Sequence, residues 1–251
     1  MSDQESFISH LIELRERLMR AAAAVLVFFI ALFFWPGSGA IYDFLAQPLM
    51  SALPEGAKMI ATGVVTPFMV PMKVTALVAF LIALPYVLYQ AWAFVAPGLY
   101  EHEKKLALPL VIGSTVLFYL GVAFCYYFVF GRVFTFIHAF APKSITPAPD
   151  IEAYFSFVIT MFIAFGVTFE IPIVVILLVR MGLISVEKLR DARPYVIVGA
   201  FVVAAVVTPP DVVSQFMLAV PMCVLYEAGL FFARFTVRSK SAPQDSADPA
   251  H

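Results

Sequence analysis

One acidic residue lies inside a long apolar segment of the sequence. Glu170 is the only charged residue between Tyr154 and Val179. A charged side chain at membrane depth costs roughly 2.5 to 3.5 kcal/mol on insertion scales, so such groups usually face a protein interior or a hydrated cavity. Two interpretations stay open at this point. Glu170 is either a protonated acid in an interhelical hydrogen bond, or a functional group on a groove or an ion path.

Two further acids lie in polar segments beside apolar runs. Glu13 belongs to an amphipathic N-terminal segment and precedes Arg17 by four residues, a spacing at which a helix forms a surface ion pair worth about 0.3 to 0.5 kcal/mol. Glu103 lies on a short charged connector, where a single acid is most simply a solvated loop charge. Together the two carboxylates could form an anionic patch that binds the guanidinium groups of a cationic peptide.

Motifs of enzymes are missing from the sequence. It contains no His-Glu-x-x-His, no Gly-x-Ser-x-Gly and no Walker-type glycine loop. A metal site made from Glu101, His102 and Glu103 would be cramped on one loop. We therefore expect a protein that is not an enzyme, has no metal or other cofactor, and has no nucleic-acid partner.

The composition excludes a water-soluble domain. Of the 251 residues, 62% are apolar and only 13% are charged, and the mean hydropathy is +0.93. No soluble domain of this size can hide so much apolar surface in one core. The chain is predicted to be an all-α, multi-pass membrane protein.

Six apolar runs are long enough to be considered as membrane helices. The fifth has thirteen residues, about 20 Å of helix against a hydrocarbon core of ~30 Å. The sixth is also predicted to be short, because Gln215, Pro221 and Glu227 interrupt it. Two short crossings leave a recess that would suit Glu170. The predicted spans, within a membrane domain of residues 1–238 and before a disordered tail at 239–251, are 19–35, 70–95, 106–130, 154–179, 195–207 and 212–232.

The distribution of basic residues predicts the orientation. Six crossings put both termini on one side of the membrane. Under the positive-inside rule the side richer in Lys and Arg is cytoplasmic, which here is the side of the termini. The basic residues on that side are Arg15, Arg17, Arg20, Lys104, Lys105, Arg180, Lys188, Arg190, Arg193, Arg234, Arg238 and Lys240, against Lys58, Lys73, Arg132 and Lys143 opposite.

Five separated blocks of sequence, taken in order, are similar to one known family. They are SHLIELRER at 9–17, QAWAFVAPGLY at 90–100, FGVTFEIP at 165–172, RPY at 193–195 and TPPD at 208–211. The chain resembles the TatC family, the multi-spanning receptors of the twin-arginine protein translocase, over about residues 7–235. Lys104 and Lys105 depart from the family pattern, in which arginines are common at these positions.

The resemblance implies a fold and a function. A TatC protein is a cup-shaped, six-helix protein of the bacterial inner membrane, with both termini in the cytoplasm. It binds folded precursor proteins through a signal peptide that carries consecutive arginines. It assembles with the single-span subunits TatA and TatB, and is expected to form homo-oligomers within that complex among the membrane lipids. Export is driven by the proton-motive force.

The resemblance also assigns roles to residues. It places signal-peptide contacts on Glu13 and Glu103, with Arg15 and Phe94 in support. It places Glu170 on a concave face formed by the short fifth and sixth helices, where it contacts partner helices. The other implied positions are Asp211 and Gln215 at the outer turn, Tyr126 in the third span and Pro48 in the external cap.

A rival function is a proton-coupled secondary transporter of a small solute that uses Glu170 as its relay. Such a protein needs a second charge near mid-membrane and usually an internal repeat of broken helices. Glu227 lies too near the end of its span for that role, and the sequence shows no repeat. The receptor is the favoured prediction.

Overall fold

A computed structural model describes residues 2–51, 59–95, 107–140, 148–208 and 211–238. Within these ranges the chain is helical and has no β-strand; an isolated bridge joins Ile60 to Asp150. Five helical stretches are long and apolar enough to cross a membrane, and a shorter apolar helix covers Arg193–Val207. The prediction of an all-α membrane protein with a short fifth crossing is confirmed.

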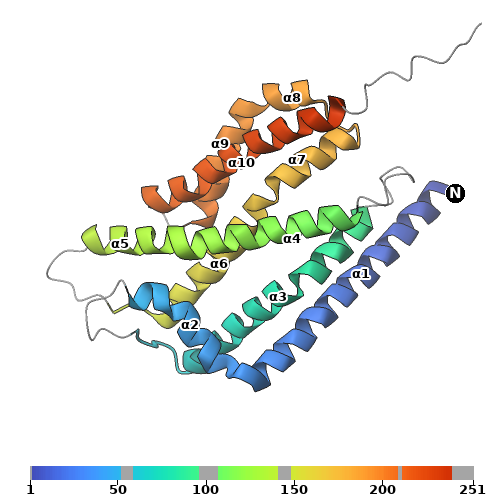
Figure 1. Ribbon diagram of the computed structural model, residues 1–251. Helices are drawn as coiled ribbons and strands as arrows, with labels where there is room; N and C mark the ends of the chain where they lie inside the picture. The colour runs from blue at the N-terminus through green and yellow to red at the C-terminus, as the bar shows by residue number, and fades with distance from the viewer. Residues whose placement is uncertain (1, 52–58, 96–106, 141–147, 209–210, 239–251) are drawn as a thin grey trace, which may run out of the picture.

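The helices form an open array with their ends gathered on two sides (Figure 1). Helix α1 (Ser2–Leu32) lies beside α3 (Thr66–Val95), and α4 (Ala107–Phe124) crosses the middle of the array. Helices α6 (Ile151–Phe169) and α7 (Ile171–Arg180) pack on α4 and α10 respectively. Helix α9 (Arg193–Val207) packs on α10 (Val212–Arg238), and the short α8 (Val186–Asp191) lies beside them. The N-terminus and the end of α10 are on the same side of the array.

A short helix caps the opposite side. After α1 the chain kinks at Trp35, whose backbone is extended, and enters α2 (Ser38–Met50). Ile41 and Leu45 of α2 are buried, as expected for an amphipathic cap. The Tyr154 hydroxyl donates a hydrogen bond of 3.0 Å to the Leu45 carbonyl oxygen, and so ties α2 to α6.

On the same side, a cluster of polar contacts made by Asp150 and Glu152 joins the start of α6 to Thr62 and Lys73. Asp150 caps the start of α6 by accepting hydrogen bonds from the backbone N–H groups of Glu152 and Ala153. It also accepts hydrogen bonds from the N–H and hydroxyl of Thr62. These bonds hold the pKa of Asp150 below its ordinary value, the backbone bond from Ala153 most of all. Lys73 Nζ forms an ion pair of 3.0 Å with Glu152 Oε1, and this pair joins α6 to α3.

Two helices differ from the predicted spans. The third continues beyond residue 130 through α5 (Phe130–Phe140). Within it the Arg132 guanidinium lies over the Phe128 ring, 4.3 Å from the centroid. The predicted short sixth helix was wrong: α10 has 27 residues, or about 40 Å. Pro221 lies inside it without ending it, and the Gln215 side chain finds a partner instead of interrupting the helix.

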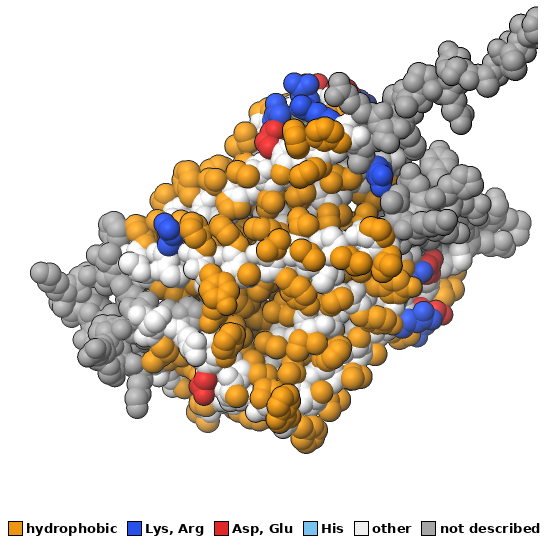
Figure 2. Space-filling model, in the orientation of Figure 1, with side chains coloured by type: hydrophobic (Ala, Val, Ile, Leu, Met, Phe, Trp, Pro, Cys, Tyr) orange, Lys and Arg blue, Asp and Glu red, His pale blue; other side chains and the backbone are white. Residues whose placement is uncertain are grey.

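The surface supports a membrane location. Figure 2 shows apolar side chains across the middle of the visible face, with Lys and Arg gathered toward the side that carries the N-terminus and α8. Many exposed side chains are large and apolar, among them Leu26 and Val27 of α1, Phe34 and Val206. A continuous apolar surface of this kind is typical of contact with lipid. The chain is a multi-pass membrane protein.

Candidate functional site

The predicted receptor acid Glu13 lies on α1, at the side of the N-terminus. Its Oε1 accepts two hydrogen bonds from Arg17, at 2.9 Å from Nε and 2.7 Å from Nη2. Its Oε2 lies 3.9 Å from His10 Nδ1. The Glu13 side chain is 34% exposed, so the carboxylate is partly buried and still reachable from water. A carboxylate in this setting can accept further hydrogen bonds from a cationic ligand.

Helix α3 supports this acid through two contacts. Arg17 Nη1 donates a hydrogen bond of 3.5 Å to Gln90 Oε1, and Gln90 is buried. The His10 ring stacks on the Phe94 ring, with centroids 4.4 Å apart and an angle of 22°. Glu13 and Phe94 are therefore brought together as predicted residues of one site, with His10 between them.

The other predicted rim residues are placed differently. Arg15 is exposed on α1 and, two residues from Glu13, projects from a different part of the helix surface. Glu103 lies outside the described residues, in the connector between α3 and α4. The interpretation of Glu13 and Glu103 as a joint anionic patch therefore stays a prediction.

Glu170 marks a break in the fourth crossing. It ends α6 and precedes α7, where Pro172 occupies the first turn and cannot donate a backbone hydrogen bond. Both carboxyl oxygens are buried, and neither has a hydrogen-bond partner among the described residues. Ser114 of α4 lies close to the carboxyl group. The Ser114 hydroxyl also accepts a hydrogen bond of 3.0 Å from Trp92 Nε1.

The polar residues at the start of α10 form hydrogen bonds within the fold. Asp211 Oδ1 accepts a 2.7 Å hydrogen bond from the Ser214 N–H and caps α10. Its Oδ2 is buried without a partner in the described residues. The Gln215 amide donates a hydrogen bond of 3.2 Å to the Phe201 carbonyl oxygen, which joins α10 to α9. Neither residue is hydrogen-bonded to Glu170.

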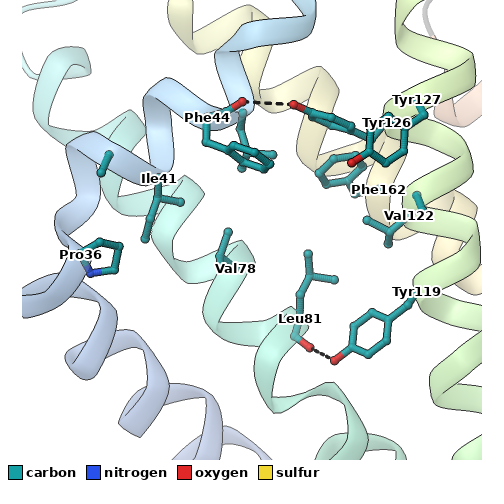
Figure 3. A pocket seen from close by; sticks show the side chains of 13 residues that line it. Pro36, Ile41, Phe44, Val78, Leu81, Tyr119, Val122, Tyr126, Tyr127 and Phe162 are labelled. Atoms are coloured by element: carbon teal, nitrogen blue, oxygen red, sulfur yellow. Dashed lines mark hydrogen bonds between the residues drawn. The ribbon is translucent and has the colours of Figure 1, made fainter.

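Tyr126 borders a cavity of about 480 Å³ whose lining is almost entirely apolar (Figure 3). The cavity lies between α2, α3 and the third crossing. The Tyr126 hydroxyl donates a hydrogen bond of 3.3 Å to the Phe44 carbonyl oxygen, and the two rings stack with centroids 5.8 Å apart. The Tyr119 hydroxyl donates a hydrogen bond of 2.6 Å to the Leu81 carbonyl oxygen at the same cavity. Pro48 falls within α2.

Sequence reasoning missed Gln90 and Ser114 as parts of these sites. Gln90 is a buried polar residue four positions before Phe94, near the end of an apolar span. A polar residue in such a span is a signal of a functional or structural contact, and it was available in the sequence. Ser114 gave no signal, because a serine can satisfy its hydroxyl within its own helix. Its importance depends on the tertiary approach of Trp92 and Glu170.

Comparison with known proteins decides the family. The family model described as Sec-independent protein translocase protein (TatC) matches residues 9–221. This chain belongs to the TatC family. The TatC protein of Haemophilus influenzae is 51% identical over 235 residues, which cover 94% of this chain and 91% of that protein. The TatC protein of Escherichia coli strain K12 is 48% identical over 237 residues, with the same two coverages.

A solved TatC structure has the same fold. A crystal structure described as the twin arginine translocase receptor TatC superimposes with a TM-score of 0.80 and 37% identity. The matched region covers 91% of this chain and 100% of the chain in that structure. A second crystal structure, of TatC in the detergent DDM, also gives 0.80 with 36% identity. The six-helix architecture of this TatC family member and its place in the twin-arginine system follow from these likenesses.

Proposed function

We propose that this chain is the signal-peptide receptor of a twin-arginine translocase, and that Glu13 and Glu103 bind the consecutive arginines. The observation that carries the proposal is Glu13. It is a partly exposed carboxylate at the membrane rim, it has an oxygen open to a ligand, and it belongs to a fold whose solved relatives are described as receptors. A guanidinium group matches a carboxylate in charge and hydrogen-bond geometry.

The second acid belongs to the connector that follows α3. Phe94 lies near the end of α3, and its ring stacks on His10 beside Glu13. The described end of α3 therefore lies next to the first acid. Two acids that each accept one guanidinium would account for a pair of arginines better than one acid could.

The proposal includes an orientation and partners. Both termini lie in the cytoplasm of a bacterium, and the chain spans the inner membrane. It assembles with TatA and TatB, forms homo-oligomers within that complex, and supports export driven by the proton-motive force. The basic residues of α1 and α8 on the side of the termini support this orientation. Glu170 supports a partner contact, because its buried oxygens lack a hydrogen bond among the described residues. The remaining proposed contact positions are Tyr126, Asp211, Gln215 and Pro48.

Site-specific crosslinking tests the receptor function. A photoreactive residue beside the arginine pair of a precursor is scored for adducts with the chain, and one at position 170 of the chain is scored for adducts with TatA or TatB. We expect precursor adducts with the parent chain and partner adducts at position 170. Glu13→Ala and Glu103→Ala should abolish precursor binding while the protein stays in the membrane.

Glu16→Ala is the matched control, because Glu16 pairs with exposed Arg20 at 3.3 Å on the same helix. It should bind the precursor normally. Normal binding in both single variants and in the double variant would refute the receptor function. Proton-coupled uptake of a small solute by the chain alone in liposomes would favour the transporter instead.

A further inference from the structure

The two oxygens of the Glu13 carboxylate are used unequally. Arg17 places both of its donated hydrogen bonds on Oε1. Oε2 is left with His10 Nδ1 at 3.9 Å as its ion-pair neighbour among the described residues, a distance too long for a hydrogen bond. An incoming cation can therefore reach Oε2 without displacing Arg17.

Arg17 is anchored, unlike Arg20 in the comparable pair three residues further along the helix. Its side chain is 23% exposed and reaches Gln90, which is 4% exposed on α3. Glu16 and Arg20 have the same i,i+4 spacing, but their side chains are 56% and 60% exposed. An exposed pair samples many rotamers. The bond to Gln90 restricts Arg17, and through Arg17 it restricts Glu13.

The other flank of Glu13 is restricted as well. His10 belongs to α1, and its ring is stacked on Phe94 of α3. Glu13 therefore lies between two side chains that α3 holds in place. Phe94 acts on the acid through His10 in this arrangement, and Gln90 acts on it through Arg17.

We propose that Arg17, held by Gln90, is a positioning residue that presents Oε2 of Glu13 to a guanidinium group of the signal peptide. The proposal rests on the proposed receptor function and adds the residues that set its specificity. A carboxylate fixed before binding loses less conformational freedom when the ligand arrives. A fixed oxygen also favours the directional, planar guanidinium over an ammonium group, which binds as a point charge from any direction.

The opposite role for Arg17 is that of a competitor that occupies Glu13 until the signal peptide displaces it. The geometry favours positioning, because Arg17 leaves one oxygen open and is itself tied to a buried amide. The two roles predict opposite changes in affinity when Arg17 is replaced.

Peptide binding to the full chain in lipid nanodiscs separates these roles. The probes are a fluorescent signal peptide with two consecutive arginines and the same peptide with two lysines. Gln90→Leu removes the acceptor with little change in volume, and Arg17→Gln removes the charge. Each should weaken arginine-peptide binding about tenfold, the loss of one charge-assisted hydrogen bond, and should lower the preference for arginine over lysine. Arg17→Lys should recover part of the affinity.

Controls distinguish positioning from folding. Glu16→Gln should bind both peptides as the parent chain does. The double variant Glu13→Arg with Arg17→Glu keeps an ion pair but moves the carboxylate; it should keep the thermal midpoint of the parent and lose the arginine peptide. Tighter binding by Arg17→Gln, or an unchanged affinity and arginine preference in Gln90→Leu, would overturn the proposal. Unchanged binding in Glu13→Ala would overturn the receptor function instead.

Discussion

Gly121 allows α4 and α6 to approach closely beside the break in the fourth crossing, and replacing it with alanine should force them apart. A Cβ atom at this position would lie 2.5 Å from the Phe165 carbonyl oxygen and 3.0 Å from the carbonyl carbon. Real Cβ atoms essentially never come so close, and a backbone group cannot rotate away as a side chain can. Overpacking of this kind typically costs 1 to 3 kcal/mol. We expect Gly121→Ala to lower the free energy of unfolding by about 2 kcal/mol.

The assay compares Gly121→Ala with Gly199→Ala by unfolding in detergent micelles. A Cβ atom at Gly199 of α9 would meet nothing within 4 Å. Alanine there should be neutral or stabilising, because glycine in a helix interior is roughly 0.8 to 1 kcal/mol less favourable than alanine. The pair of variants thus adds the same methyl group to two helices with opposite expected signs. Equal stability of the two variants would refute the reasoning.

Two further predictions concern the side opposite the N-terminus. Tyr154→Phe should cost about 1 kcal/mol, because it removes a buried hydrogen bond to the Leu45 carbonyl oxygen; thermal unfolding in detergent measures the loss, and an unchanged midpoint would contradict it. Asp150 has a lowered pKa, so the stability it contributes is present above its ordinary pKa of 3.8 and disappears as the pH falls through its folded-state pKa. The difference in thermal midpoint between the parent chain and Asp150→Asn should therefore be larger at pH 7 than in acid, and a constant difference would contradict this sign.

Apolar patterning predicted the class of fold because each crossing needs an uninterrupted supply of apolar side chains. It predicted the ends of helices less well. Pro221 and Gln215 were expected to shorten the sixth helix, but a membrane helix tolerates a proline, and the Gln215 amide bonds to the Phe201 carbonyl oxygen. The third span was expected to end at residue 130, yet the helix continues past Arg132, whose guanidinium packs on Phe128. The partner of Gln215 comes from another helix, whereas Phe128 lies only four residues before Arg132 on the same helical stretch.

The candidate site shows the same limit. Residue types and spacing suggested Glu13 as a receptor acid, and the spacing to Arg17 suggested an ordinary surface ion pair. The predicted ion pair between Glu13 and Arg17 is present. It is partly buried and not fully exposed, because Arg17 also contacts Gln90, which belongs to a helix more than seventy residues away in sequence. No pattern within a single helix can reveal a partner of that kind. The break at Glu170 has a local signal in the sequence, since Pro172 cannot donate a backbone hydrogen bond.

The polar groups of this protein fall into two kinds, and the distinction separates folding from function. Gln215 and Tyr154 complete their hydrogen bonds within the chain, so each stabilises the fold and its replacement should appear first as lost stability. Oε2 of Glu13 and both oxygens of Glu170 have no such bond among the described residues. A buried acid without a partner costs stability instead of adding to it. Replacing Glu170 by Gln should therefore leave the fold as stable as before or more so, and reduce assembly with partner helices. A large loss of stability in Glu170→Gln would show that Glu170 stabilises the fold, as Gln215 and Tyr154 do, and would contradict this prediction.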